Sequence, residues 1–136
     1  MKVFVDANIL FSAADPGSAS RLLLDALRKR AAVVVNEHVW EEARRNVALK
    51  RPALTQALAE LKPRLHFTAL LANVSDTGLP DKDLPVLGGA AASRCTHLWT
   101  GDRRHFGSLY GQTIRGTLIV SGGQLADQLE REGWLP

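Results

Sequence analysis

The sequence contains very little cysteine and no long apolar run. Cys95 is the one cysteine among 136 residues, which excludes an internal disulfide and a zinc site built from several cysteines. No stretch of about eighteen apolar residues occurs, so a conventional membrane-spanning helix is also excluded. The apolar residues after Met1 are interrupted at Asp6, too early for a signal peptide. We therefore expect a protein of a reducing compartment, the cytoplasm.

The composition is that of an ordinary globular protein. Hydrophobic residues make up 46% and charged residues 23% of the chain, and its length suits one hydrophobic core but not two. We therefore expect a single domain over residues 1–136. The net charge of +3 favours a polyanionic partner only mildly, and a protein with slightly more basic than acidic surface residues explains it equally well.

Short β-branched runs alternate with helical patterns along the whole chain. Strands are expected at residues 3–5, 31–35, 65–70, 98–99 and 117–120. Helices are expected at residues 18–30, through 40–47, between Pro52 and Pro63, at 83–94 and at 124–132. Strands that alternate with helices form βαβ units, so we predict an α/β fold, a three-layer α/β/α sandwich with a central parallel sheet.

Two aspartates come directly after predicted strands. Asp6 follows the first strand and Asp102 follows the fourth. In open parallel sheets, ligands bind beyond the carboxyl ends of the strands, where the strand order reverses. If these two strands are neighbours, both carboxylates lie in the same crevice. Each also has a plain structural interpretation, because Asp6 would suit a cap and Asp102 a turn beside Gly101.

Three further acids, Glu41, Glu42 and Asp83, become informative when they are considered with this pair. Glu41 and Glu42 lie on a charged helix, where most glutamates are solvated, and Asp83 is also a suitable cap for the helix that follows it. Several carboxylates in one pocket would repel one another by about 4 kcal/mol per pair at a separation of about 4 Å unless a cation lay among them. Oxygen ligands suit Mg²⁺ or Mn²⁺, and the chemistry such an ion supports is hydrolysis of a phosphodiester.

Four short motifs, in order, resemble those of the PIN-domain nucleases. They are Val5-Asp6-Ala7-Asn8-Ile9-Leu10, Val39-Trp40-Glu41-Glu42-Ala43-Arg44-Arg45, Pro80-Asp81-Lys82-Asp83-Leu84-Pro85-Val86-Leu87 and Leu98-Trp99-Thr100-Gly101-Asp102. The resemblance covers nearly the whole chain. It implies the strand order 3-2-1-4-5, which would place the first and fourth strands side by side.

The resemblance also implies a function and a set of site residues. Many small PIN proteins are VapC-type toxins, ribonucleases that an antitoxin protein holds inactive, so RNA is the implied substrate and an antitoxin the implied partner. The matched catalytic residues are Asp6, Glu42, Asp83 and Asp102, with Asp6, Asp83 and Asp102 as ligands of Mg²⁺ or Mn²⁺. A slip of the match would give Glu41 for Glu42 or Asp81 for Asp83, and both alternatives stay open.

The residues around the fourth motif depart from the family pattern. Many relatives have another acid shortly after the Thr-Gly-Asp aspartate, whereas this chain continues Arg103-Arg104-His105. One ion is therefore the expectation. These basic residues would meet substrate phosphates at the mouth of the pocket, or form a solvated turn. Thr100 and Asn8 are expected to support the acids, although a threonine in a strand has an equally simple structural explanation.

Other functions remain open at the level of the sequence. One is a stand-alone PIN-like nuclease that processes RNA. A phosphoryl-transfer enzyme with an aspartyl nucleophile would usually have a second aspartate where Asn8 stands. An RNA-binding domain without activity is the alternative that is not an enzyme, but acids without a metal would repel phosphate. The stripe Leu22, Leu23, Ala26 and Leu27, with Trp134-Leu135, would suit a homodimer or an antitoxin, or simply the core.

Overall fold

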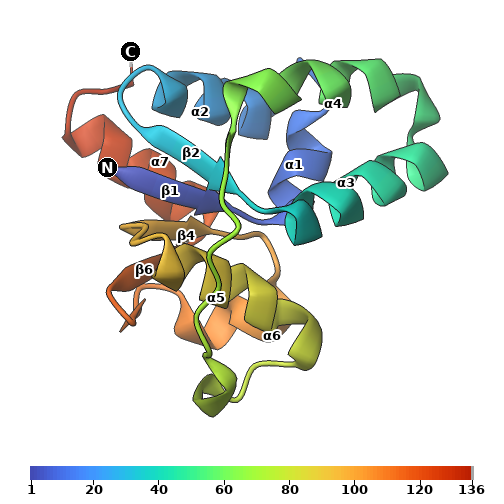
Figure 1. The fold of residues 1–136 in the computed structure, drawn as a ribbon. Coiled ribbons are helices and arrows are strands. Elements are labelled where there is room, and N and C mark those ends of the chain that lie inside the picture. Colours follow the sequence, from blue (N-terminus) through green and yellow to red (C-terminus); the bar gives the residue numbers. More distant parts are fainter. Residues whose placement is uncertain (136) are drawn as a thin grey trace.

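The computed structural model describes residues 1–135 and contains one mixed sheet at its centre (Figure 1). The strands lie in the order β3-β2-β1-β4-β6-β5. All neighbouring strands are parallel except β5 and β6, which are antiparallel. The strands are β1 (Lys2–Val5), β2 (Ala32–Val35), β3 (His66–Phe67), β4 (His97–Trp99), β5 (Thr113–Ile114) and β6 (Thr117–Val120).

The first strand lies at the middle of the sheet and pairs with strands on both sides. Phe4 is opposite Val34 of β2 and Leu98 of β4. From β1 the chain builds outward first through β2 and β3 and later through β4 and β6, so the strand order reverses between β1 and β4. The predicted order 3-2-1-4-5 is confirmed, since the predicted fifth strand is β6, and the structure adds β5 at the edge.

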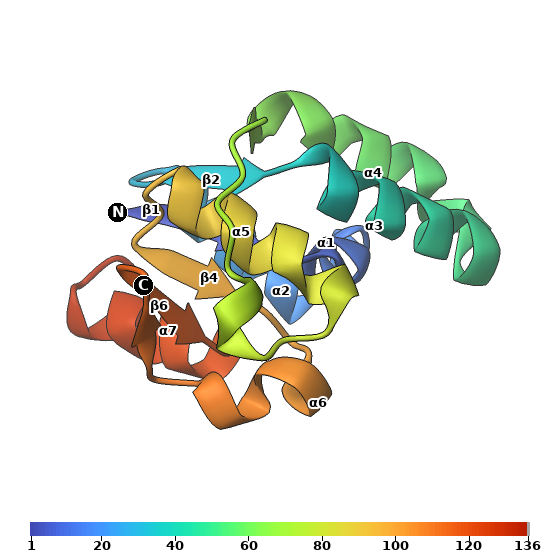
Figure 2. The same ribbon diagram turned by 60° about the horizontal axis from the view of Figure 1, so that its bottom comes forward.

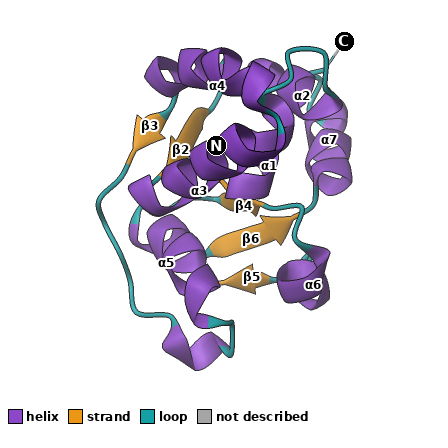
Figure 3. Cartoon of the chain, turned by 90° about the vertical axis from the view of Figure 1, so that its right-hand side faces the viewer, coloured by secondary structure: helices purple, strands orange, loops and turns teal. Residues whose placement is uncertain are grey.

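Helices cover both faces of this sheet. They are α1 (Ala7–Ala13), α2 (Ala19–Arg28), α3 (Glu37–Lys50), α4 (Thr55–Leu61), α5 (Leu84–Ala92), α6 (Arg103–Phe106) and α7 (Gly122–Arg131). Helix α5 packs on β1 and β4, whereas α2 packs on β2 and α7 on β6 from the other side (Figures 2 and 3). The predicted three layers are therefore present. None of the helices within residues 1–135 is long and apolar enough to cross a membrane.

The central strands are buried because apolar residues occupy almost every position in them. Val3, Phe4 and Val5 of β1 are completely buried, as expected for a strand covered on both faces. Polar side chains directly before the helices cap them. The side chains of Ser18 and Asn36 accept hydrogen bonds from backbone N–H groups in the first turns of α2 and α3.

Several short elements differ from the sequence prediction. The predicted strand at residues 65–70 is only His66–Phe67, both exposed at the edge of the sheet. Helices α1 and α6 and strand β5 were not predicted. Each has seven residues or fewer, too short for a helical or alternating pattern to repeat, so contacts with the rest of the fold determine them.

Candidate active site

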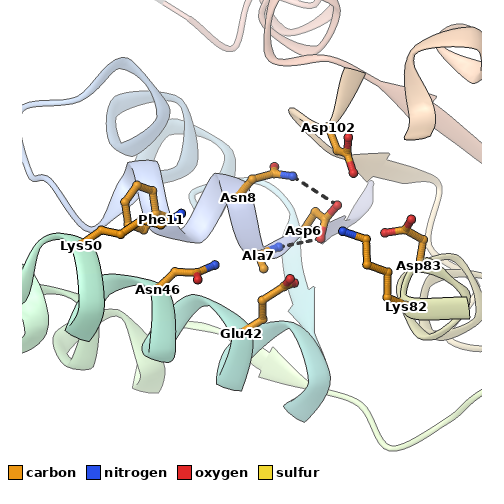
Figure 4. Close-up of a pocket in the computed structure, with 10 residues that line it drawn as sticks. All are labelled: Asp6, Ala7, Asn8, Phe11, Glu42, Asn46, Lys50, Lys82, Asp83 and Asp102. Carbon is orange, nitrogen blue, oxygen red and sulfur yellow. Dashed lines mark hydrogen bonds between the residues drawn. The ribbon is translucent and has the colours of Figure 1, made fainter. Parts of the chain in front are cut away.

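An acidic cavity of about 230 Å³ lies beyond the carboxyl ends of β1 and β4, where the strand order reverses (Figure 4). The four predicted acids all line it, although they come from four separate parts of the chain. The lining residues are Asp6, Ala7, Asn8, Phe11, Glu42, Asn46, Lys50, Lys82, Asp83 and Asp102. The structure thus brings the acids of all four motifs to one place.

Asp6 lies at the innermost part of this group and is held on several sides. It ends β1 and caps α1, where its Oδ1 accepts a hydrogen bond of 2.7 Å from the backbone N–H of Ala7. The hydroxyl of Thr100 donates to Oδ2 at 2.8 Å, and the side-chain amide of Asn8 lies 3.5 Å from the same oxygen. The carboxylate is therefore oriented before any ligand binds.

The protonation of Asp6 reflects its burial. The side chain is 4% exposed, and loss of water contact raises its pKa to about 6. Hydrogen bonds from Thr100 and Ala7 act in the opposite direction, while the nearby charges of Glu42 and Asp83 raise the pKa further. A bound cation would offset both the burial and the repulsion.

Thr100 and Asn8 connect the turn after β1 with the turn after β4. Besides donating to Asp6, the Thr100 hydroxyl accepts a 3.1 Å hydrogen bond from the backbone N–H of Asp102. Asn8 accepts a 2.8 Å hydrogen bond from the backbone N–H of Gly101. The two residues thereby fix the position of Asp102 relative to Asp6, as a supporting role requires.

Glu42 faces the cavity, whereas Glu41 does not line it. Glu42 is partly exposed on α3, and its carboxylate points toward Asp6 in Figure 4. Glu41 instead accepts hydrogen bonds from the Arg44 guanidinium at 2.8 and 3.0 Å, which lower the pKa of Glu41. Of the two glutamates that the sequence left open, the structure places Glu42 with the other acids.

The structure also distinguishes Asp83, which lines the cavity, from Asp81, which does not. Both lie in the 3₁₀ turn Asp81–Asp83 before α5, but Asp81 is exposed and lies outside this cavity. Asp83 is 6% exposed and lines it. Asn36 aligns the first turn of α5 with α3, because its side chain caps α3 and also donates to the carbonyl of Pro85 at 3.0 Å.

Asp102 and Asp83 meet a histidine that the sequence analysis assigned only to a basic run. Asp102 caps α6, and its Oδ1 accepts a 3.1 Å hydrogen bond from the backbone N–H of His105. Nδ1 of His105 lies 2.7 Å from Asp83 Oδ2 and 3.2 Å from Asp102 Oδ2. These three side chains form a compact group of potential metal ligands, with all three atoms within 4.8 Å of one another.

Comparison with known proteins identifies the fold. No family model and no curated protein matches the sequence. A chain of the crystal structure of VapBC2 from Rickettsia felis bound to a DNA fragment from their promoter superimposes with a TM-score of 0.66 at 18% identity, over 89% of this chain and 98% of that chain. A chain of VapBC-1 from nontypeable Haemophilus influenzae gives a TM-score of 0.59 at 11% identity, with the same coverage. The fold is VapC-like and PIN-like. The resemblance seen in the motifs is thus confirmed for the fold.

The cavity is also lined by basic and amide side chains to which the sequence analysis gave no role. Asn46 and Lys50 follow Glu42 at intervals of four residues on α3, so the three side chains share one face of that helix. This spacing is the signal by which they could have been found. Lys82 extends from the turn before α5 toward Asp6 (Figure 4). Arg103 and Arg104 are exposed on α6, next to Asp102, and do not line the cavity.

The residues present fit a divalent cation. Asp83 Oδ2 is buried, accepts no hydrogen bond and has Nδ1 of His105 2.7 Å away, so a cation at this point would contact both atoms. Asp6 and Asp102 add carboxylate oxygens from the adjacent strand ends. Carboxylate-rich sites of this kind are typical of Mg²⁺ and Mn²⁺.

Proposed function

We propose that this chain is a metal-dependent endoribonuclease, the toxin of a toxin–antitoxin pair. The observation that carries the proposal is the convergence of Asp6, Glu42, Asp83 and Asp102 on one cavity at the switch point of a PIN-like sheet. The fold shared with chains of two VapBC structures supports it independently. A single domain over residues 1–136 and a cytoplasmic location are parts of the same proposal.

In this proposal three aspartates hold the ion and fix its position. Asp6, Asp83 and Asp102 are the ligands, and the hydrogen bonds from Thr100 and Ala7 keep Asp6 oriented. A bound Mg²⁺ or Mn²⁺ supplies activation of water and stabilisation of the charge that builds on the phosphoryl group.

Glu42 has a different role in this proposal from that of the three aspartates. Glu42 is partly exposed and lines the cavity from α3, outside the compact group of Asp83, Asp102 and His105. We assign it the role of general base, in which its Oε atoms accept the proton of the attacking water. Lys50 and Lys82, which line the same cavity, provide positive charge for the phosphates that flank the cleaved bond.

A cleavage assay with matched variants tests the proposal. Purified protein is incubated with a mixed-sequence RNA in Mg²⁺, in Mn²⁺ and in EDTA. We expect cleavage only with metal, and a loss of at least about 100-fold for Asp6→Asn, Glu42→Gln, Asp83→Asn and Asp102→Asn. Glu41→Gln and Asp81→Asn are the controls, since each changes a neighbouring acid outside the cavity and should leave the rate within about threefold.

The same assay separates the alternatives. An RNA-binding domain without activity would bind RNA equally well with and without Mg²⁺ and would leave it intact. A phosphoryl-transfer enzyme with an aspartyl nucleophile would become labelled by a phosphoryl donor at Asp6. Metal-dependent cleavage that persists in the folded Asp6→Asn variant would overturn the assignment of the site.

The proposed protein partners are an antitoxin and a second copy of this chain. The predicted stripe on α2 is divided in the structure, because Leu27 is completely buried while Leu22 is 66% exposed. Leu22, Leu23 and Ala26 line an apolar groove between α2 and α7, together with Leu135. Light scattering should show a dimer that Leu22→Glu dissociates, whereas Leu49→Glu, at an exposed leucine of α3, leaves it intact.

A further inference from the structure

His105 occupies a special position beside the acidic cavity. The Asp102 carboxylate caps the short helix α6 through the backbone N–H of His105, which brings the imidazole back alongside that same carboxylate. The ring is 21% exposed, and its Nδ1 atom is buried. The ring therefore faces the two aspartates and not the solvent.

The contact between His105 and Asp83 is close, yet it is not a hydrogen bond. Nδ1 and Oδ2 are 2.7 Å apart, but their alignment leaves both atoms buried without a hydrogen-bond partner. The Asp83 side chain is 8% exposed, so water does not replace the missing partner. Two buried polar atoms this close form an ion pair when the ring is protonated, whereas with a neutral ring a shared cation would satisfy both.

The spacing of these atoms matches ligands around one ion. Adjacent ligands of an octahedral ion with bonds of about 2.1 Å lie about 3.0 Å apart. Nδ1 of His105 lies 2.7 Å from Asp83 Oδ2 and 3.2 Å from Asp102 Oδ2, close to that value on both sides. Asp6, the third proposed oxygen ligand, accepts hydrogen bonds at both of its oxygens, and each oxygen keeps a lone pair for an ion.

From this geometry we infer that His105 is a direct ligand, through Nδ1, of the divalent ion held by Asp83 and Asp102. The inference rests on the proposed function for the presence of an ion in this cavity. It changes the ligand set from oxygen alone to oxygen with one imidazole nitrogen. Nitrogen ligands favour transition-metal ions over Mg²⁺, so the site should prefer Co²⁺ and Mn²⁺.

Metal binding to the metal-free protein tests the inference without any measurement of activity. Calorimetric titrations with Mg²⁺, Mn²⁺ and Co²⁺ are compared for the unmodified protein, His105→Ala and His105→Gln. We expect each variant to lose affinity for Co²⁺ by about 10- to 100-fold, for Mn²⁺ by less, and for Mg²⁺ least of all. His105→Asp should recover Mg²⁺ binding but not the preference for Co²⁺.

A spectroscopic signature separates a ligand from a residue that only supports the fold. Electron spin-echo modulation of the bound Mn²⁺ should show coupling to an imidazole nitrogen in the unmodified protein. The coupling should disappear in both His105→Ala and His105→Gln. His66→Ala is the control, since His66 is an exposed histidine that lines a different cavity with Lys2 and Ser93, and it should keep the coupling.

Each outcome of these experiments either supports or overturns the assignment of His105 as a metal ligand. Nitrogen coupling that depends on His105, with the predicted order of losses, supports the inference. Bound Mn²⁺ without nitrogen coupling, or equal losses for all three ions, overturns it and makes His105 a charged neighbour of the two aspartates. RNA cleavage in Mg²⁺ without that coupling would leave the proposed function intact, whereas the coupling in a protein that cleaves no RNA would overturn only the proposed function.

Discussion

At the scale of the residue, the burial of Asp6 makes the metal-free protein sensitive to pH. Its pKa is raised from 3.8 to about 6, so the folded state holds this proton more tightly than the unfolded state. Well below pH 3.8, Asp6 is protonated in both the folded and the unfolded state, so its burial does not lower the free energy of unfolding. Between pH 4 and 6 the unfolded state ionises first, so the folded state loses stability as pH rises, by up to about 3 kcal/mol above pH 6.

Asp6→Asn removes this penalty and should stabilise the metal-free protein. We expect its free energy of unfolding in urea and EDTA to exceed that of the unmodified protein by about 1–3 kcal/mol at pH 7.5, and the gain to shrink toward pH 4. Asp127→Asn, at an exposed position of α7, is the control and should give no gain that depends on pH. An Asp6→Asn variant that is less stable than the unmodified protein at pH 7.5 would contradict this account.

The acids could be found from the sequence, but the role of His105 could not. Asp6 and Asp102 follow buried strands, and that position alone indicates a site at the switch point. Glu42 and Asp83 needed the family resemblance, and the choice against Glu41 and Asp81 needed side-chain directions. The position of the His105 ring depends on Asp102, which lies three residues earlier and caps α6. An Asp-x-x-His spacing predicts this contact only when the aspartate is known to be a helix cap.

At the scale of the element, helix α5 depends on glycine for its close packing. A Cβ on Gly88 would lie 2.5 Å from the carbonyl oxygen of Ala72, in the segment that crosses over the helix. We expect Gly88→Ala to lower the free energy of unfolding by about 1–3 kcal/mol, despite the higher helix propensity of alanine. Thermal unfolding measures this. Gly123→Ala in α7, where the nearest atom is 4.0 Å away, should cause no loss.

Helix α6 presents the two arginines that we expect to bind substrate. Arg103 and Arg104 are exposed beside Asp102, as phosphate-binding residues at the edge of the site would be. A Glu42→Gln background should remove cleavage and leaves the proposed metal ligands in place. In this background, replacing both arginines with alanine should weaken binding of single-stranded RNA. The slope of log affinity against log salt should fall by about 0.7 for each phosphate that the double variant no longer neutralises.

The control for this prediction is Arg131→Ala, at an exposed position in the last turn of α7. Fluorescence anisotropy at several salt concentrations gives both quantities. An unchanged slope in the double variant would show that these arginines only form a solvated turn, the other interpretation that the sequence allowed. An equal effect of Arg131→Ala would indicate general attraction to a basic surface.

At the scale of the whole molecule, the strand order explains how distant acids meet. Neighbouring strands β1 and β4 are separated by more than ninety residues in the chain, yet their carboxyl ends lie side by side. The alternation of strands and helices along the chain predicts a parallel sheet, but the order of its strands came from the family resemblance. The antiparallel edge strand β5 has two residues and no pattern of its own. It depends on pairing with β6, so local sequence did not reveal it.

The proposed toxin role also belongs to the whole molecule, because it requires the folded site to meet cellular RNA. We expect induced expression of the unmodified chain in a bacterium to stop growth within a few generations and to produce new RNA 5′ ends. Asp83→Asn at the same soluble level should permit growth, since it removes the buried ligand while leaving the exposed surface unchanged. Normal growth despite soluble protein that cleaves RNA after purification would contradict the toxin role and leave the nuclease chemistry standing. Restored growth on co-expression of a protein that binds the chain and blocks cleavage in vitro would identify the antitoxin.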